Sequence, residues 1–169
     1  YYIDGKRITA AAIDVTDPVQ RCLLDYSILC NDSTNENGVE IGDPTETALI
    51  NLGSQYGIEA EGVRKLYPRE GELPFDSDRK RMSTLHRING ENRMIVKGAV
   101  DRLLELTEQI WTKDGVRKIT AADKEKIQLQ NQEFSIEGLR VLAFTYREMP
   151  ENHRLAREDE KHLIFLGLI

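Results

Sequence analysis

The chain has 169 residues, of which 40% are hydrophobic and 31% are charged, and its formal net charge is −6. These values are typical of one globular domain with its own hydrophobic core, and no apolar run is long enough to span a membrane. The negative charge argues against a nucleic-acid surface, which needs a basic patch, but it leaves room for a small-anion site. Cys22 and Cys30 have no partners at metal-ligand spacing, so we expect two reduced, buried thiols and no bound metal.

The first third of the chain begins with an extended segment and a helix. Residues 1–12 predict a short strand with a turn at Asp4-Gly5. The pair Asp17-Pro18 predicts a helix start, because the carboxylate can cap free N–H groups and proline fits the first helical position. This helix should end near Asn31, where a polar, turn-rich stretch to Glu40 predicts an exposed loop.

A second helix is predicted from the segment Gly42-Asp-Pro-Thr-Glu-Thr-Ala-Leu49. Asp43 can cap this helix, and Glu46 stands at the third helical position, as in a capping box. A carboxylate at the mouth of a helix can instead receive a donor from a ligand, such as an exocyclic amine. Both interpretations stay open, and from the local pattern we favour simple capping.

A β-hairpin is predicted in the middle of the chain, after a short helix over residues 58–66. Arg81 to Ile88 has the alternating pattern of a strand, and Asn89-Gly90 is a strong hairpin signal. The return strand is predicted to run from Arg93 to Lys97. We expect His86 to lie on the surface of the sheet.

The segment from Phe75 to Met82, together with Lys97-Gly98, carries most of the chemistry. An aromatic ring can stack on a base, cations can face phosphates, and a strand-to-helix junction can hold an anion. Met82 is a soft filler for the floor of a base pocket. The alternatives are that Phe75 belongs to the core and that Arg79-Lys80-Arg81 is a solvated face.

The last third of the chain predicts one long helix between strands. A turn at Lys113-Asp114-Gly115 joins two short strands, and Thr120 with Asp123 predicts a capping box that opens the helix. Leu139 to Tyr146 predicts a strand that contains Arg140, either as an edge charge or as a clamp for a phosphate. The final apolar residues predict a last buried strand.

These elements predict an α+β fold. Hairpins are interleaved with helices, and the regular strand–helix–strand repetition of a doubly wound α/β fold is absent. We expect a twisted, mainly antiparallel sheet of about six or seven strands with helices on both faces. Neither a P-loop nor a dinucleotide-binding glycine fingerprint occurs in the sequence.

Five short motifs occur in a fixed order along nearly the whole chain. They are Cys30-Asn31-Asp32, Gly42 to Leu49, Phe75 to Met82, Lys97-Gly98-Ala99 and Leu139 to Ala143. In this order and spacing they resemble the nucleotide-binding domain of P-type cation-transporting ATPases, and most closely its calcium-pump branch. One departure is Val100-Asp101, where the family often has Pro-Glu; we expect a looser turn there and an unchanged binding geometry.

The resemblance implies a nucleotide-binding site without catalytic residues of its own. Its nine residues are Phe75, Lys97, Glu46, Lys80, Arg140, Met82, Leu142, Gly98 and Asp43. Phe75 is implied to stack on adenine, and Glu46 to meet the adenine amine or to orient its neighbours. Lys80 and Lys97 are implied to line the pocket toward the base, ribose and phosphates, and Arg140 to reach a phosphate. Met82 and Leu142 are implied to form apolar walls of the pocket. Asp43 is implied to lie near the mouth of the nucleotide pocket.

The resemblance also implies a single domain, residues 1–169, excised from a larger multidomain membrane ATPase. A start without Met and an apolar C-terminal run fit this expectation. In the family this domain is an insertion within the phosphorylation domain, on the cytoplasmic face of the membrane. The implied partners are ATP and the phosphorylation and actuator domains of the same parent chain, with no nucleic acid.

The expected activity is limited to binding. The family's phosphoryl acceptor lies in an Asp-Lys-Thr-Gly-Thr motif, which this chain lacks. Phosphoryl transfer needs that acceptor and a magnesium site, so the Mg²⁺ that accompanies ATP is implied to be held mainly by the phosphorylation domain. We therefore expect a monomer that binds ATP and does not turn over by itself.

A hypothesis of a different class is a non-enzymatic protein-interaction domain. In that case the basic run at residues 79–81 docks an acidic partner, and the binding fades with salt. Such a domain would not distinguish ATP from tripolyphosphate, because only a stacked base separates these two ligands.

Overall fold

The structure is a computed structural model that describes all 169 residues, from Tyr1 to Ile169. Its strands are β1 (Tyr2–Ile3), β2 (Lys6–Arg7), β3 (Thr34–Glu36), β4 (Val39–Ile41), β5 (Arg69–Asp76), β6 (Arg81–Ile88), β7 (Glu91–Gly98), β8 (Thr107–Thr112), β9 (Gly115–Lys118), β10 (Ala143–Met149) and β11 (Leu163–Leu168). Its helices are α1 (Pro18–Leu29), α2 (Pro44–Gln55), α3 (Ala60–Leu66), α4 (Val100–Glu105) and α5 (Ala121–Ile136), with short 3-10 turns at Ala10–Ala12 and Arg157–Asp159. None of these helices combines the length and the apolar character that crossing a membrane requires.

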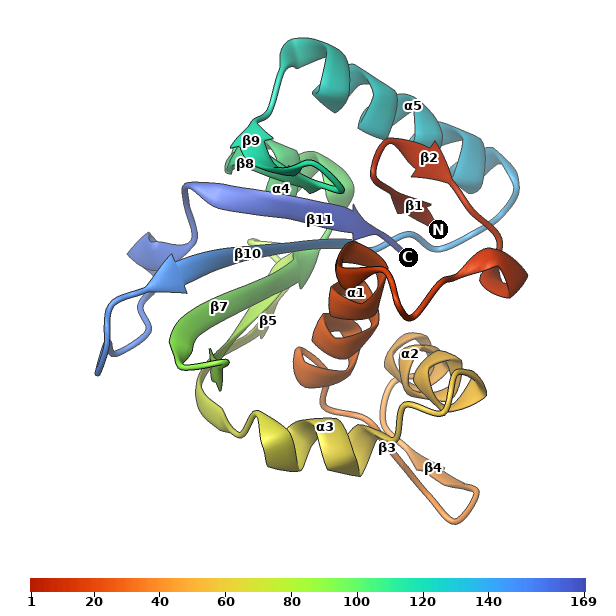
Figure 1. Ribbon diagram of the computed structural model, residues 1–169, viewed down its shortest axis with the longest axis vertical. Coiled ribbons are helices and arrows are strands. Elements are labelled where there is room, and N and C mark those ends of the chain that lie inside the picture. Colours follow the sequence, from red (N-terminus) through yellow and green to blue (C-terminus); the bar gives the residue numbers. More distant parts are fainter.

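A nine-stranded sheet runs through the molecule (Figure 1). Neighbouring strands follow the order β2-β1-β11-β10-β7-β6-β5, and the hairpin of β8 and β9 branches from β11. All pairs are antiparallel except β8 with β11. The predicted α+β class and mainly antiparallel sheet are confirmed. The sheet has more strands than expected because the N-terminal segment folds back at Asp4-Gly5, where both residues have positive φ, and adds β1 and β2.

Helices cover both faces of this sheet, as predicted. Along β7, Ile95 packs in one buried cluster with residues of α1, α2 and α3, including Leu23. Its neighbours Met94 and Val96 pack in a second cluster with α4 and α5, including Leu103. Successive side chains of a strand point to opposite faces, so the two clusters lie on opposite sides of the sheet.

Local sequence signals set the starts of the helices. The Asp17 side chain accepts hydrogen bonds from the backbone N–H groups of Val19 and Gln20, at 2.9 and 3.1 Å. Thr120 and Asp123 form the predicted capping box at the start of α5. Each cap satisfies N–H groups that the first turn of a helix leaves free.

Two parts of the predicted fold were wrong. The stretch predicted as a loop after α1 contains the hairpin of β3 and β4, whose turn residues Asn37 and Gly38 have φ of 53° and 82°. Positive φ at both central residues is what a tight two-residue hairpin needs. The strand predicted from Leu139 begins only at Ala143, although Leu142 already exchanges backbone hydrogen bonds with Ile169 at 2.7 and 2.9 Å.

His86 lies inside the protein and not on the surface of the sheet, with 1% of its surface exposed. Its Nδ1 is 2.9 Å from the Tyr67 carbonyl oxygen, and its Nε2 is 2.9 Å from the Thr84 hydroxyl. The chain before β5 covers this part of β6, which the alternation within β6 alone does not reveal. Burial is the main cause that lowers the pKa of His86 to about 4.

The buried His86 makes the stability dependent on pH. The unfolded chain binds this proton with a pKa near 6.5, so the contribution is complete above that value and is lost as pH falls toward 4. At pH 5 the loss should reach about 2 kcal/mol of unfolding free energy. Urea unfolding at pH 7 and pH 5 measures it, and His86→Gln should show a smaller drop than the wild type. The exposed His162→Gln is the control; an equal drop in all three proteins would contradict the assignment.

Candidate functional site

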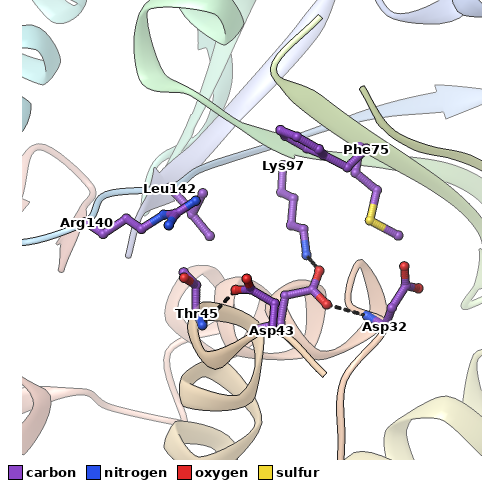
Figure 2. A pocket seen from close by; sticks show the side chains of 9 residues that line it. Asp32, Asp43, Thr45, Phe75, Lys97, Arg140 and Leu142 are labelled. Atoms are coloured by element: carbon purple, nitrogen blue, oxygen red, sulfur yellow. Dashed lines mark hydrogen bonds and ion pairs between the residues drawn. The ribbon is translucent and has the colours of Figure 1, made fainter. Parts of the chain in front are cut away.

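A pocket of about 290 Å³ lies between α2 and the sheet (Figure 2). Its nine lining residues are Asp32, Asp43, Thr45, Glu46, Phe75, Met82, Lys97, Arg140 and Leu142. They come from the connection after α1, the N-terminus of α2, three adjacent strands and the connection before β10. The fold therefore gathers into one space residues that are far apart in the sequence.

Seven of the nine predicted site residues line this pocket, and two do not. Lys80 and Gly98 are the residues outside it. Asp32 and Thr45 line it without having been predicted as site residues. Both belong to the motifs that carried the family resemblance, and this membership was the only signal in the sequence that pointed to them.

An irregularity in the β5–β6 ladder presents Phe75 to the pocket. Leu73 pairs with Ser83 and Asp76 pairs with Arg81, so two residues of β5 stand opposite the single residue Met82. Such a β-bulge re-aims side chains, and the residue before Phe75 is a proline, which cannot donate to the ladder. Phe75 keeps 64% of its surface exposed, whereas Met82 keeps 1% and forms an apolar wall. The hypothesis that Phe75 belongs to the core is therefore wrong.

Lys97 and Glu46 form an ion pair across the pocket. Their side chains are 7% and 16% exposed, and the Lys97 ammonium donates to Oε1 of Glu46. The other carboxylate oxygen of Glu46 accepts from the backbone N–H of Asp32 at 3.0 Å and from the Ser33 hydroxyl at 3.4 Å. The pair links β7 to the first turn of α2, and Figure 2 shows Lys97 reaching down to the carboxylate.

The two carboxylates at the start of α2 have separate roles. Asp43 caps the helix by accepting from the backbone N–H of Thr45 at 2.8 Å, as predicted. Glu46 does not close the expected capping box, because its oxygens are engaged by Lys97 and by the connection after α1. Hydrogen bonds from Thr45 lower the pKa of Asp43, and the positive charge of the exposed Arg140 adds a smaller effect.

Two of the three cations in the basic run are not solvated. The side chains of Arg79 and Arg81 are only 12% and 16% exposed, and both are paired with the buried carboxylate of Glu160. Lys80 between them is exposed and has a φ of 54°. The interpretation of the run as a solvated face is therefore wrong for both arginines, because both pair with one carboxylate about 80 positions away.

Gly98 allows two backbone segments to approach each other. A Cβ atom at this position would lie 2.4 Å from the carbonyl oxygen of Lys80 and 2.7 Å from Cβ of Arg81. The same carbonyl accepts a hydrogen bond from the backbone N–H of Ala99 at 3.1 Å. Glycine at this position thus holds the turn after Phe75 against the end of β7.

The site offers cations, carboxylates and an exposed ring, but no cluster of metal ligands. No group of three or more His, Cys, Asp or Glu side chains is arranged to hold a metal ion. The pocket can accept a flat aromatic ligand against Phe75, with apolar contacts from Met82 and Leu142. Charged or polar parts of the same ligand can face Arg140 and the carboxylates.

The ion pair of Glu46 and Lys97 should be visible in the stability. Glu46→Gln and Lys97→Met each leave a largely buried charge without its partner, so each should cost about 3 kcal/mol in urea unfolding. The double variant should cost clearly less than the sum of the two. Glu61→Gln, which removes the exposed pair with Lys65, is the control and should have a much smaller effect. Strictly additive costs would show that the two charges do not interact.

Comparison with known proteins gives consistent matches over most or all of the chain. A family model described as "P-type ATPase, cytoplasmic domain N" matches residues 20–169. Calcium-transporting ATPase 1 of Bacillus cereus is 37% identical over 169 residues, which is 100% of this chain and 19% of that protein. Calcium-transporting ATPase 1 of Lactococcus lactis is 41% identical over 157 residues, 92% of this chain and 18% of that protein. The chain thus spans about a fifth of the length of these relatives.

Proposed function

The chain belongs to the family of P-type ATPase cytoplasmic N domains, and from this premise we propose that it binds ATP and delivers it to the phosphorylation domain of a calcium-type P-type ATPase. The observation that carries the proposal is the exposed ring of Phe75 over a pocket that also contains a wall of apolar side chains and fixed charges. A base stacked on such a ring contributes roughly 1–3 kcal/mol.

In this proposal the pocket divides between the base and the phosphates. Adenine stacks on Phe75 between the apolar side chains of Met82 and Leu142. Its exocyclic amine donates to Glu46, whose carboxylate is already held in place by donors from two other segments. A carboxylate held in this way needs no reorganisation when the ligand arrives, which favours binding.

The cations serve the ribose and the phosphates. Lys97 lies beside the base, and Arg140 at the exposed rim can reach a phosphate with its planar guanidinium. Lys80, outside the pocket itself, is exposed on the turn after Phe75 and can meet the end of the phosphate chain. Asp43 lies near the mouth, where a carboxylate disfavours a misplaced phosphate.

The remaining steps belong to a longer parent protein. Residues 1–169 act as one nucleotide-binding domain, and the phosphoryl acceptor, the main Mg²⁺ ligands and the actuator domain lie elsewhere in that protein. ATP-driven calcium transport is then the activity of the whole, on the cytoplasmic face of a membrane. The isolated chain binds ATP as a monomer and does not hydrolyse it, since phosphoryl transfer needs an acceptor and a metal in line.

The alternative of a protein-interaction domain loses most of its support. Its docking surface was the basic run, yet Arg79 and Arg81 are paired internally with Glu160. Only Lys80 remains available to an acidic partner, and a single exposed ion pair contributes little.

Replacing the ring tests the proposed function. Phe75→Ala should weaken ATP binding roughly 5- to 150-fold, which corresponds to the loss of one stacked base. NMR titration of the amide signals measures this effect. Tripolyphosphate, which has no base, should bind the wild type and the variant alike.

Ile136→Ala is a matched control for this titration, because Ile136 is 87% exposed and lies outside the pocket. It should bind ATP as the wild type does. If the wild type does not bind ATP more tightly than tripolyphosphate, or if Phe75→Ala binds ATP unchanged, base stacking on Phe75 is excluded.

A further inference from the structure

Glu160 is a buried carboxylate with no place in the pocket. It follows the 3-10 turn before β11, and its side chain is completely buried. Three donors converge on it: Arg79 at 2.5 Å, Nε of Arg81 at 2.6 Å and the Ser83 hydroxyl at 2.6 Å. Burial alone would raise its pKa, but these hydrogen bonds lower the pKa below its ordinary value. A carboxylate bound in this way stays charged and keeps both guanidinium groups in fixed positions.

Arg79 connects this carboxylate to the backbone next to Phe75. One terminal nitrogen of its guanidinium donates to Glu160, and the other donates to the carbonyl oxygen of Pro74 at 2.8 Å. That carbonyl belongs to the peptide group that immediately precedes Phe75. The planar fork of arginine holds two acceptors at a fixed separation, so Glu160 and the start of the bulge cannot move independently.

The rest of the turn is fixed at several points. The Asp76 side chain accepts from the backbone N–H groups of Asp78 and Arg79, at 2.9 and 3.0 Å. The Lys80 carbonyl oxygen accepts a hydrogen bond from the backbone N–H of Ala99, directly after β7. Phe75 itself has no such restraint on its side chain, because most of the ring faces solvent. Its direction therefore depends on the backbone on either side of it.

We infer that Glu160 is a positioning residue for nucleotide binding, because Glu160 sets the direction of the Phe75 ring through Arg79. The inference rests on the proposed function, since it concerns the ring on which adenine would stack. It places one determinant of base binding in the connection between β10 and β11, 81 residues from Arg79 along the chain. A preorganised ring loses less freedom on binding than one carried by a mobile turn.

The variant Glu160→Gln tests this inference, because it keeps the shape of the side chain and removes its charge. It should bind ATP about fivefold more weakly than the wild type, the lower end of the effect of one stacked base. It should not weaken tripolyphosphate binding. In the Phe75→Ala background the same substitution should have no further effect on ATP affinity, which a general loss of stability would not reproduce.

A matched control is Asp123→Asn. Asp123 also accepts from an arginine, a threonine hydroxyl and one backbone N–H group, but it lies at α5 and not at the pocket. Asp123→Asn should lose stability and keep its ATP affinity. Arg79→Lys is the second test variant if Glu160→Gln does not fold, because an ammonium retains the charge but cannot bridge both acceptors; it too should weaken ATP binding.

The outcomes separate this inference from the proposed function. A wild type that does not bind ATP removes the proposed function, and this inference with it. Wild-type ATP affinity in folded Glu160→Gln, or in folded Arg79→Lys when Glu160→Gln does not fold, overturns the positioning role alone. An equal loss from Glu160→Gln with and without the Phe75 ring also overturns it, since the effect would then not pass through Phe75.

Discussion

The ion pair between Lys97 and Glu46 is the contact on which the pocket depends. Lys97 is the penultimate residue of a central strand, and Glu46 lies in the first turn of α2, so the pair fixes the distance between the sheet and this helix. The same carboxylate also holds the connection after α1 through Asp32 and Ser33. Three separate segments therefore meet at one pair of charges, and the space beside it is the pocket.

The backbone at the pocket holds the Phe75 ring in a solvent-exposed position. A large apolar side chain is normally buried, and exposure of Phe75 has to be imposed by the backbone. The bulge opposite Met82, the proline before the ring and the restrained turn after it supply that constraint. Gly98 contributes by letting the turn pack directly against β7. The paired charge of Arg79 and the exposed ring of Phe75 thus lie within a few residues of each other.

Much of the fold could be predicted from the sequence, because the signals are local. The cap at Asp17, the capping box at Thr120 and the turn at Asn89-Gly90 each involve residues a few positions apart, and the structure has all three. Asn37-Gly38 is the same kind of signal, but the strands on either side of it have only three residues each, so the polar stretch predicts a loop. The pocket residues were predicted through short motifs in a fixed order rather than through geometry.

The sequence by itself determined most of the element types and the α+β class, since helix caps, turns and alternation act within one or two turns of chain. It indicated most of the residues that line the pocket only through the order of the short motifs. Only the tertiary structure decided that Glu46 pairs with Lys97, that Glu160 pairs with both Arg79 and Arg81, and that the chain before β5 buries His86. These contacts join residues about 20 to 80 positions apart. Their partners are chosen by packing across the sheet, which no local pattern encodes.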